Sequence, residues 1–114
     1  MKIIYYGKDK QPVKEFIDKL PLKDRAKIFA CLKSLEDIGL DTPRVVCRQI
    51  MGKLWEIKIN ASIGYRIFYV MIEKYTMVLL HGYKKKSQKA PSREIEIATN
   101  RMTEVLKNET IYIR

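Results

Sequence analysis

The chain has 114 residues, of which 46% are hydrophobic and 32% charged, and its 23 Lys and Arg residues against 13 Asp and Glu give a net charge of +10. This length fits one domain with a single core, and the hydrophobic content excludes a disordered chain. The apolar runs are too short to cross a bilayer, and the N-terminus lacks the features of a signal peptide, so we expect a cytoplasmic protein with no membrane partner.

The first part of the chain predicts one strand and two helices. Residues 2–6 form a short β-rich run. A helix follows over 12–20, because apolar residues recur there at i, i+3, i+4 and i+7, and Pro21 disfavours helical geometry in the residue before it. A second helix is expected over 22–38, with Gly39 placed to cap its C-terminus. The short link between them predicts a helical hairpin.

The rest of the chain changes to the period of two that marks β-strands. Three strands are expected, over 54–60, 65–72 and 75–83, and a turn is expected at 62–64. Their short connections make an antiparallel meander. A last helix is expected over 92–107. The predicted fold class is α+β: an antiparallel sheet with two N-terminal helices and one C-terminal helix, in one domain over 1–107, followed by a β-prone tail over 108–114.

The positive charge is concentrated in the middle of the chain. Residues 44–89 carry 10 basic side chains and only Glu56 and Glu73 as acids, so this segment holds +8 of the +10. Such a concentration indicates a polyanionic partner, of which nucleic acid is the commonest. The alternative is a solvated basic face without a partner.

Two cations lie inside the predicted strands. Lys58 points away from the apolar face of its strand, and Arg66 is the only charged residue inside an otherwise apolar strand. A dehydrated arginine needs an acid or a bound anion. Two interpretations stay open for Arg66: a cross-strand pair with Glu56, or a binding role on the face of the sheet that does not enter the core.

A basic segment follows the last strand of the meander. Its lysines are Lys84, Lys85, Lys86 and Lys89. They form either a flexible loop or part of a binding surface. Three tyrosines are expected near the predicted cations in the folded sheet: Tyr65, Tyr69 and Tyr83. Such rings can stack on unpaired RNA bases or pack as core residues. The lone histidine, His81, is either a packed, hydrogen-bonded side chain or a general acid or base.

The sequence lacks the groups that many hydrolases use. It shows no metal-binding carboxylate pair, glycine-rich phosphate loop or Ser/His/Asp arrangement, and one histidine excludes a zinc site built from Cys and His alone. Cys31 and Cys47 are expected to be small buried residues of a reduced protein. Lysines, an arginine and tyrosines suit RNA cleavage by the substrate's own 2′-hydroxyl, which needs no metal or cofactor.

Several segments, in order, resemble the HigB-like branch of the RelE/ParE toxin superfamily, which includes many phage-derived proteins: VKEF, LWEIKI, YRIFY and LHGYKKKSQKAP. The resemblance spans about residues 2–106. It implies the RelE-like microbial RNase fold and a toxin of a type II toxin–antitoxin pair. Such a toxin binds the ribosomal A site, cuts messenger RNA there without a metal ion, and is neutralised by a HigA-like helix-turn-helix antitoxin, in some cases in a higher-order complex.

The resemblance also implies roles for individual residues. Arg66 matches the strand arginine that these toxins place on the scissile phosphate, and Lys58 matches a basic residue of the preceding strand. The Lys84–Lys86 segment falls where the family keeps further basic groups, and Lys53 is expected to add a ribosomal or substrate contact. Two other functions stay open: a ParE-like inhibitor of DNA gyrase, and a non-catalytic basic module that binds nucleic acid.

Overall fold

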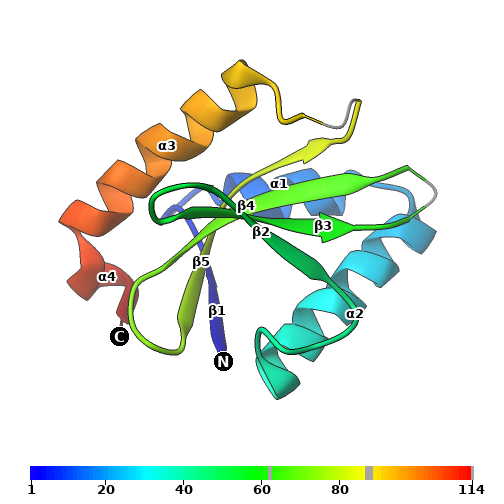
Figure 1. Ribbon diagram of the computed structural model, residues 1–114, viewed down its shortest axis with the longest axis horizontal. Coiled ribbons are helices and arrows are strands. Elements are labelled where there is room, and N and C mark those ends of the chain that lie inside the picture. The colour runs from blue at the N-terminus through cyan, green and yellow to red at the C-terminus, as the bar shows by residue number, and fades with distance from the viewer. Residues whose placement is uncertain (62, 87–88, 114) are drawn as a thin grey trace.

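The computed structural model describes residues 1–61, 63–86 and 89–113 (Figure 1). In this part of the chain one sheet is formed, in the strand order β1-β5-β4-β3-β2. The strands are β1 (Lys2–Tyr5), β2 (Val46–Met51), β3 (Leu54–Ile59), β4 (Tyr65–Met71) and β5 (Thr76–Lys84). Neighbouring strands pair antiparallel except β1, which lies parallel to β5. The predicted meander is therefore confirmed, with one strand added at each edge of it.

The helices are α1 (Pro12–Asp18), α2 (Leu22–Ile38), α3 (Ser92–Lys107) and α4 (Glu109–Ile113). The predicted α+β class is confirmed, and α2 and α3 begin and end at the predicted residues. Gly39 ends α2 with a φ of 91°, and its N–H donates to the carbonyl oxygen of Leu35 at 2.8 Å. This left-handed conformation is easily reached only by glycine, which explains the sharp end of the helix. Within the described residues, no helix combines the length and the apolar character that crossing a membrane requires.

Three elements differ from the sequence prediction. Helix α1 ends at Asp18, two residues before the predicted end, and β2 forms where the pattern predicts no separate strand. The tail, predicted to be β-prone, instead forms the short helix α4. The tail is helical because Tyr112 and Ile113 pack on the core, and the Tyr112 hydroxyl accepts the backbone N–H of Gly7 at 3.3 Å. Four residues lie outside the described ranges: Ser62 of the predicted turn, Ser87 and Gln88 of the basic segment, and Arg114 of the tail.

Helices cover both faces of the sheet. Helices α1 and α2 lie on one face, and α3 and α4 lie on the other, which we call the α3 face (Figure 1). Each face carries a hydrophobic core: Ile57, Ile67 and Leu79 belong to the first, and Phe68 and Leu80 to the second. The expectation that one face of the meander stays out of the core is therefore wrong, because α3 packs on that face. The polar side chains of the α3 face, among them those of Glu56, Lys58 and Arg66, lie together in neighbouring positions of the sheet.

A β-bulge determines which side chains of β5 reach the α3 face. Phe68 pairs with His81 whereas Tyr69 pairs with Leu79, so Leu80 is an extra residue in β5. A bulge of this kind reverses the alternation of side chains along its strand. Leu80 and His81 consequently both lie on the α3 face, and Tyr83 follows on the same face.

Candidate functional site

Two rows of side chains cross strands β2 to β5 on the α3 face. The first row contains Arg48, Glu56, Phe68 and His81. The second row contains Val46, Lys58, Arg66 and Tyr83. Residues directly opposite each other on antiparallel strands share a face and have Cβ atoms about 5 Å apart. The sheet register therefore brings three cations, one carboxylate and a tyrosine hydroxyl together from four strands.

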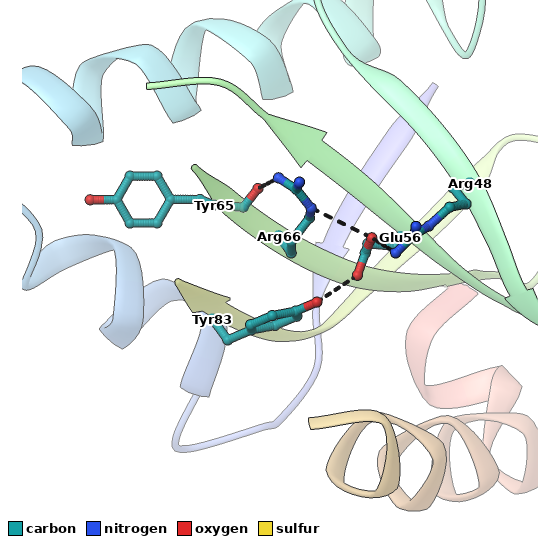
Figure 2. A network of polar contacts seen from close by, with 5 residues as sticks. All are labelled: Arg48, Glu56, Tyr65, Arg66 and Tyr83. Atoms are coloured by element: carbon teal, nitrogen blue, oxygen red, sulfur yellow. Dashed lines mark hydrogen bonds and ion pairs between the residues drawn. The ribbon is translucent and has the colours of Figure 1, made fainter. Parts of the chain in front are cut away.

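The carboxylate of Glu56 stands at the centre of this group and is fully buried. Nη2 of Arg48 donates to Oε1 of Glu56 at 2.8 Å, and the hydroxyl of Tyr83 donates to Oε2 at 2.8 Å (Figure 2). Nε of Arg66 lies 3.7 Å from Oε1. A buried carboxylate is tolerated only where cations and hydrogen-bond donors surround it, and Glu56 has both.

Arg66 is held on two sides, and its side chain is only 7% exposed. Besides the ion pair with Glu56, its Nη1 donates to the carbonyl oxygen of Tyr65 at 3.0 Å. The cross-strand pair between Arg66 and Glu56, one of the two interpretations of the sequence, is thus present. It fixes the guanidinium in one orientation next to Lys58, the residue directly opposite it on β3.

A third cation, Lys85, lies beside Arg66 just after the end of β5. Its backbone N–H donates to the carbonyl oxygen of Gly64 at 2.8 Å. A Cβ on Gly64 would lie 3.3 Å from Cδ of Lys85 and 3.6 Å from Nη1 of Arg66, so both side chains pass over this glycine. We call Lys58, Arg66 and Lys85 the cationic cluster. Within the described ranges, no ion pair joins either lysine to a carboxylate.

The other predicted lysines lie apart from the cationic cluster. Lys84 pairs with Tyr65 in the ladder, so its position belongs to the face opposite Arg66. Lys86 and Lys89 are exposed beyond the end of β5. Lys53 is exposed in the turn before β3, five residues from Lys58 and hence about 17 Å away along the strand.

Two of the three predicted stacking tyrosines lie in the wrong place for RNA. Tyr65 and Tyr69 are each 1% exposed and belong to the core beneath α1 and α2. Side chains alternate between the two faces along a strand, and these two tyrosines lie one and three residues from Arg66, so they point to the face opposite to it. The Tyr65 ring points away from Arg66 (Figure 2), and its hydroxyl donates to Oδ2 of Asp24 at 2.6 Å. Burial, together with this hydrogen bond, raises the pKa of Tyr65 to about 12. The RNA-stacking prediction for both residues is therefore wrong.

Tyr83, in contrast, does lie beside Arg66. Its ring stacks on Phe68 with 5.4 Å between the centroids, and the residue is 7% exposed. Burial and the hydrogen bond to Glu56 raise the pKa of the Tyr83 hydroxyl. In this structure Tyr83 therefore acts as a support for Glu56, and its ring already has a stacking partner.

His81 is packed and hydrogen-bonded on both ring nitrogens. Nε2 lies 2.8 Å from Oε1 of Glu94, and Nδ1 lies 3.4 Å from Nη1 of Arg101. A neutral ring that donates from Nε2 to Glu94 and accepts at Nδ1 satisfies both contacts. Burial lowers the pKa of His81, although the Glu94 carboxylate opposes this. The geometry matches the packed alternative for this residue.

Sequence reasoning missed Arg48 as a site residue. Its strand, β2, lacks a clear alternation of apolar and polar residues, so the pattern predicts neither its face nor its partner strand. The available signal was Gly52, with a φ of 51°, in the tight turn between β2 and β3. A hairpin around that turn places Arg48 opposite Glu56.

Comparisons with known proteins bear on the same region of the chain. Residues 15–103 match the model of a family described as phage derived protein Gp49-like (DUF891). This range covers well over half of the chain and contains both rows of the site. A comparison with curated proteins found no match.

Proposed function

The chain belongs to the family of phage-derived Gp49-like proteins, which is part of the RelE/ParE/HigB toxin superfamily, and from this premise we propose that it is a ribosome-dependent endoribonuclease that cuts messenger RNA. Family membership supports a RelE/HigB-like toxin. The proposal adds the substrate, the reaction and the residues that perform it.

The observation that carries the proposal is the cationic cluster beside a buried carboxylate. Arg66 is fixed by Glu56 and by a backbone carbonyl oxygen, so its guanidinium is oriented before a substrate arrives. Donors that are already oriented stabilise the charge of a transition state without paying for reorganisation. Lys58 and Lys85 are partly exposed, so their ammonium groups can meet a phosphate that approaches Arg66.

The cluster suits a reaction in which RNA supplies its own nucleophile. The 2′-oxygen attacks the adjacent phosphorus, the bond from phosphorus to the 5′-oxygen breaks, and the products are a 2′,3′-cyclic phosphate and a free 5′-hydroxyl. The proton of the 2′-hydroxyl leaves, and the 5′-oxygen gains one. Arg66 stabilises the charge on the phosphate, while Lys58 and Lys85 are the mobile groups that carry protons.

Purified ribosomes programmed with a defined message test the proposal. We expect the full-length protein to cut translated mRNA, with cut positions mapped by primer extension. Lys58→Met should slow cutting about 100-fold or more, the usual size of losing one group that transfers a proton. Lys27→Met, which removes an exposed lysine of α2 on the other side of the molecule, should cut like the wild type.

Arg66→Ala gives the second arm of the test, with a thermal melt to show that the variant is folded. A folded Arg66→Ala protein that cuts as well as the wild type would refute the proposed site. A folded wild type that leaves translated mRNA intact and instead blocks supercoiling by DNA gyrase would replace the proposal with a ParE-like function. Salt-sensitive RNA binding without any cleavage would replace it with a non-catalytic binding module.

Membership of a toxin family implies a cognate antitoxin. We propose that this partner is a small helix-turn-helix protein encoded beside the toxin. Co-expression of the two reading frames should yield a complex that co-purifies and no longer cuts mRNA. Full cutting activity in the presence of an equimolar amount of the co-expressed protein would rule it out as the antitoxin.

A further inference from the structure

A pocket lies beside the two rows, between β2 and the start of α3. Its lining residues are Arg48, Gln49, Ile50, Lys89, Ala90 and Ile95, and its volume is about 380 Å³. This volume falls within the range of small-ligand sites, about 300–1,000 Å³. Ile50, Ala90 and Ile95 supply apolar walls, and Arg48 and Lys89 supply positive charge. We call it the β2–α3 pocket.

Arg48 connects this pocket to the site described above. One end of its guanidinium donates to Glu56, and the side chain also lines the β2–α3 pocket. Its Nε atom is buried and, among the described residues, is the one buried side-chain nitrogen or oxygen without a hydrogen-bond partner. A buried donor without an acceptor destabilises a fold and is therefore rare unless a ligand completes it.

We propose that the β2–α3 pocket binds one unpaired base of the RNA strand whose neighbouring phosphate lies on the cationic cluster, an inference that rests on the function proposed above. Apolar walls suit the flat face of a base, whereas a phosphate alone would be poorly matched to Ile50, Ala90 and Ile95. Arg48 of the pocket lies one row from Lys58 and Arg66, about 7 Å away along the strands, and one and two strands away across the sheet at about 5 Å for each strand. One continuous strand of RNA reaches both.

The donor chemistry of Arg48 predicts which bases fit. A guanidinium has N–H donors and no acceptor, so the edge of the base that faces it must present acceptors. We place against Arg48 the edge that faces the major groove in a duplex, where guanine and uracil have a carbonyl oxygen and adenine and cytosine have an amino group, which is itself a donor. The pocket therefore favours uracil over cytosine and guanine over adenine.

Binding of uncleavable RNA tests the pocket separately from catalysis. The probes are short oligo-U and oligo-C with 2′-O-methyl sugars, whose bases differ in the carbonyl or amino group at position 4 and in the proton that uracil carries on N3. Affinity is measured by fluorescence anisotropy at one salt concentration. We expect the wild type to bind oligo-U about tenfold more tightly than oligo-C, the size of one discriminating contact to a base edge.

Filling the pocket should abolish this preference. Ile95→Trp places an indole in the pocket from α3, and we expect it to bind oligo-U about as weakly as oligo-C. Ile97→Trp is the matched control, because Ile97 is also half-buried on α3 but does not line the pocket, and it should keep the preference. Ile50→Trp fills the pocket from β2 and repeats the test should Ile95→Trp fail to fold.

Two results separate the pocket from the catalytic function. A wild type that cuts mRNA but binds oligo-U and oligo-C equally, or whose preference survives in folded Ile95→Trp and Ile50→Trp, overturns the pocket and leaves the nuclease in place. A wild type that shows the preference and loses it in Ile95→Trp, but never cuts translated mRNA, supports the pocket as an RNA site and overturns the nuclease.

Discussion

Replacing Glu56 with glutamine tests the central claim that a buried carboxylate organises the site. Glu56→Gln keeps the shape of the side chain but removes its charge. Arg66 then loses its only carboxylate partner among the described residues, and the Arg48 guanidinium faces a neutral amide. Tyr83 keeps an oxygen or nitrogen within reach of its hydroxyl.

The exposed fractions of the two arginines set the size of the effect. Removing one partner of a buried ion pair costs about 3–5 kcal/mol, because the other charge stays buried. The Arg66 side chain is 7% exposed and bears this cost, whereas the Arg48 side chain is 35% exposed and can turn toward water. We therefore expect Glu56→Gln to lower the free energy of unfolding by about 3 kcal/mol, near the lower end of that range.

Urea denaturation measures this change. With an m-value of about 2 kcal/mol per molar urea, the midpoint should fall by about 1.5 M. Glu96→Gln, on the exposed side of α3, is the matched control and should change the free energy by about 0.5 kcal/mol or less. A Glu56→Gln protein as stable as Glu96→Gln would refute the reasoning.

The same variant separates RNA binding from cleavage. Because the cations remain, Glu56→Gln should bind uncleavable RNA at least as tightly as the wild type under conditions where it is folded. Cutting of translated mRNA should fall, since Arg66 loses the contact that orients it. Undiminished cutting would show that Glu56 supports the fold and has no part in positioning Arg66.

Three further predictions concern the residues around the site. In Tyr65→Phe, Asp24 loses a buried hydrogen bond, so denaturation should show a loss of about 1–3 kcal/mol while RNA affinity, measured alongside, is unchanged. His81 is the only histidine, and an NMR titration of its ring should give a midpoint below 6.5, because burial disfavours the imidazolium. The free energy of unfolding should then fall as the pH drops below about 6.5, since the unfolded chain binds the proton more readily. A midpoint above 6.5 would contradict a buried neutral ring. Gly82→Ala would put a Cβ 2.8 Å from Cδ2 of Phe16, so calorimetry should show a lower Tm, equivalent to about 1–3 kcal/mol, and an unchanged Tm would mean that α1 packs elsewhere.

Local sequence patterns were sufficient for most of the elements. The bounds of α2 and α3 were predicted because apolar periodicity, Gly39 and Pro91 all act within a few residues of each helix. The tail was predicted poorly because its helix depends on a contact between Tyr112 and Gly7, which are 105 residues apart in the chain. Such long-range contacts override the weak local preference of a five-residue segment.

The site was predicted in part for the same reason. The meander places Lys58 opposite Arg66, and both belong to strands with a clear pattern. Arg48 lies in an edge strand, β2, whose residues are mostly half-buried or exposed on both sides, so no alternation marks its face. Tyr65 and Tyr69 were misplaced because β4 is buried on both faces and reads as a uniform apolar run, which hides its alternation.

The extra residue at Leu80 limits how the chain can change in length during evolution. Deleting Leu80 would restore regular pairing and leave His81, Gly82 and Tyr83 opposite the same residues of β4. Inserting one residue between His81 and Gly82 would instead exchange the two faces for everything that follows, so that Tyr83 would turn toward α1 and the inserted side chain would meet Phe16 in the space that Gly82 leaves open. A one-residue insertion after the bulge is therefore expected to be far less tolerated than the loss of the extra residue itself.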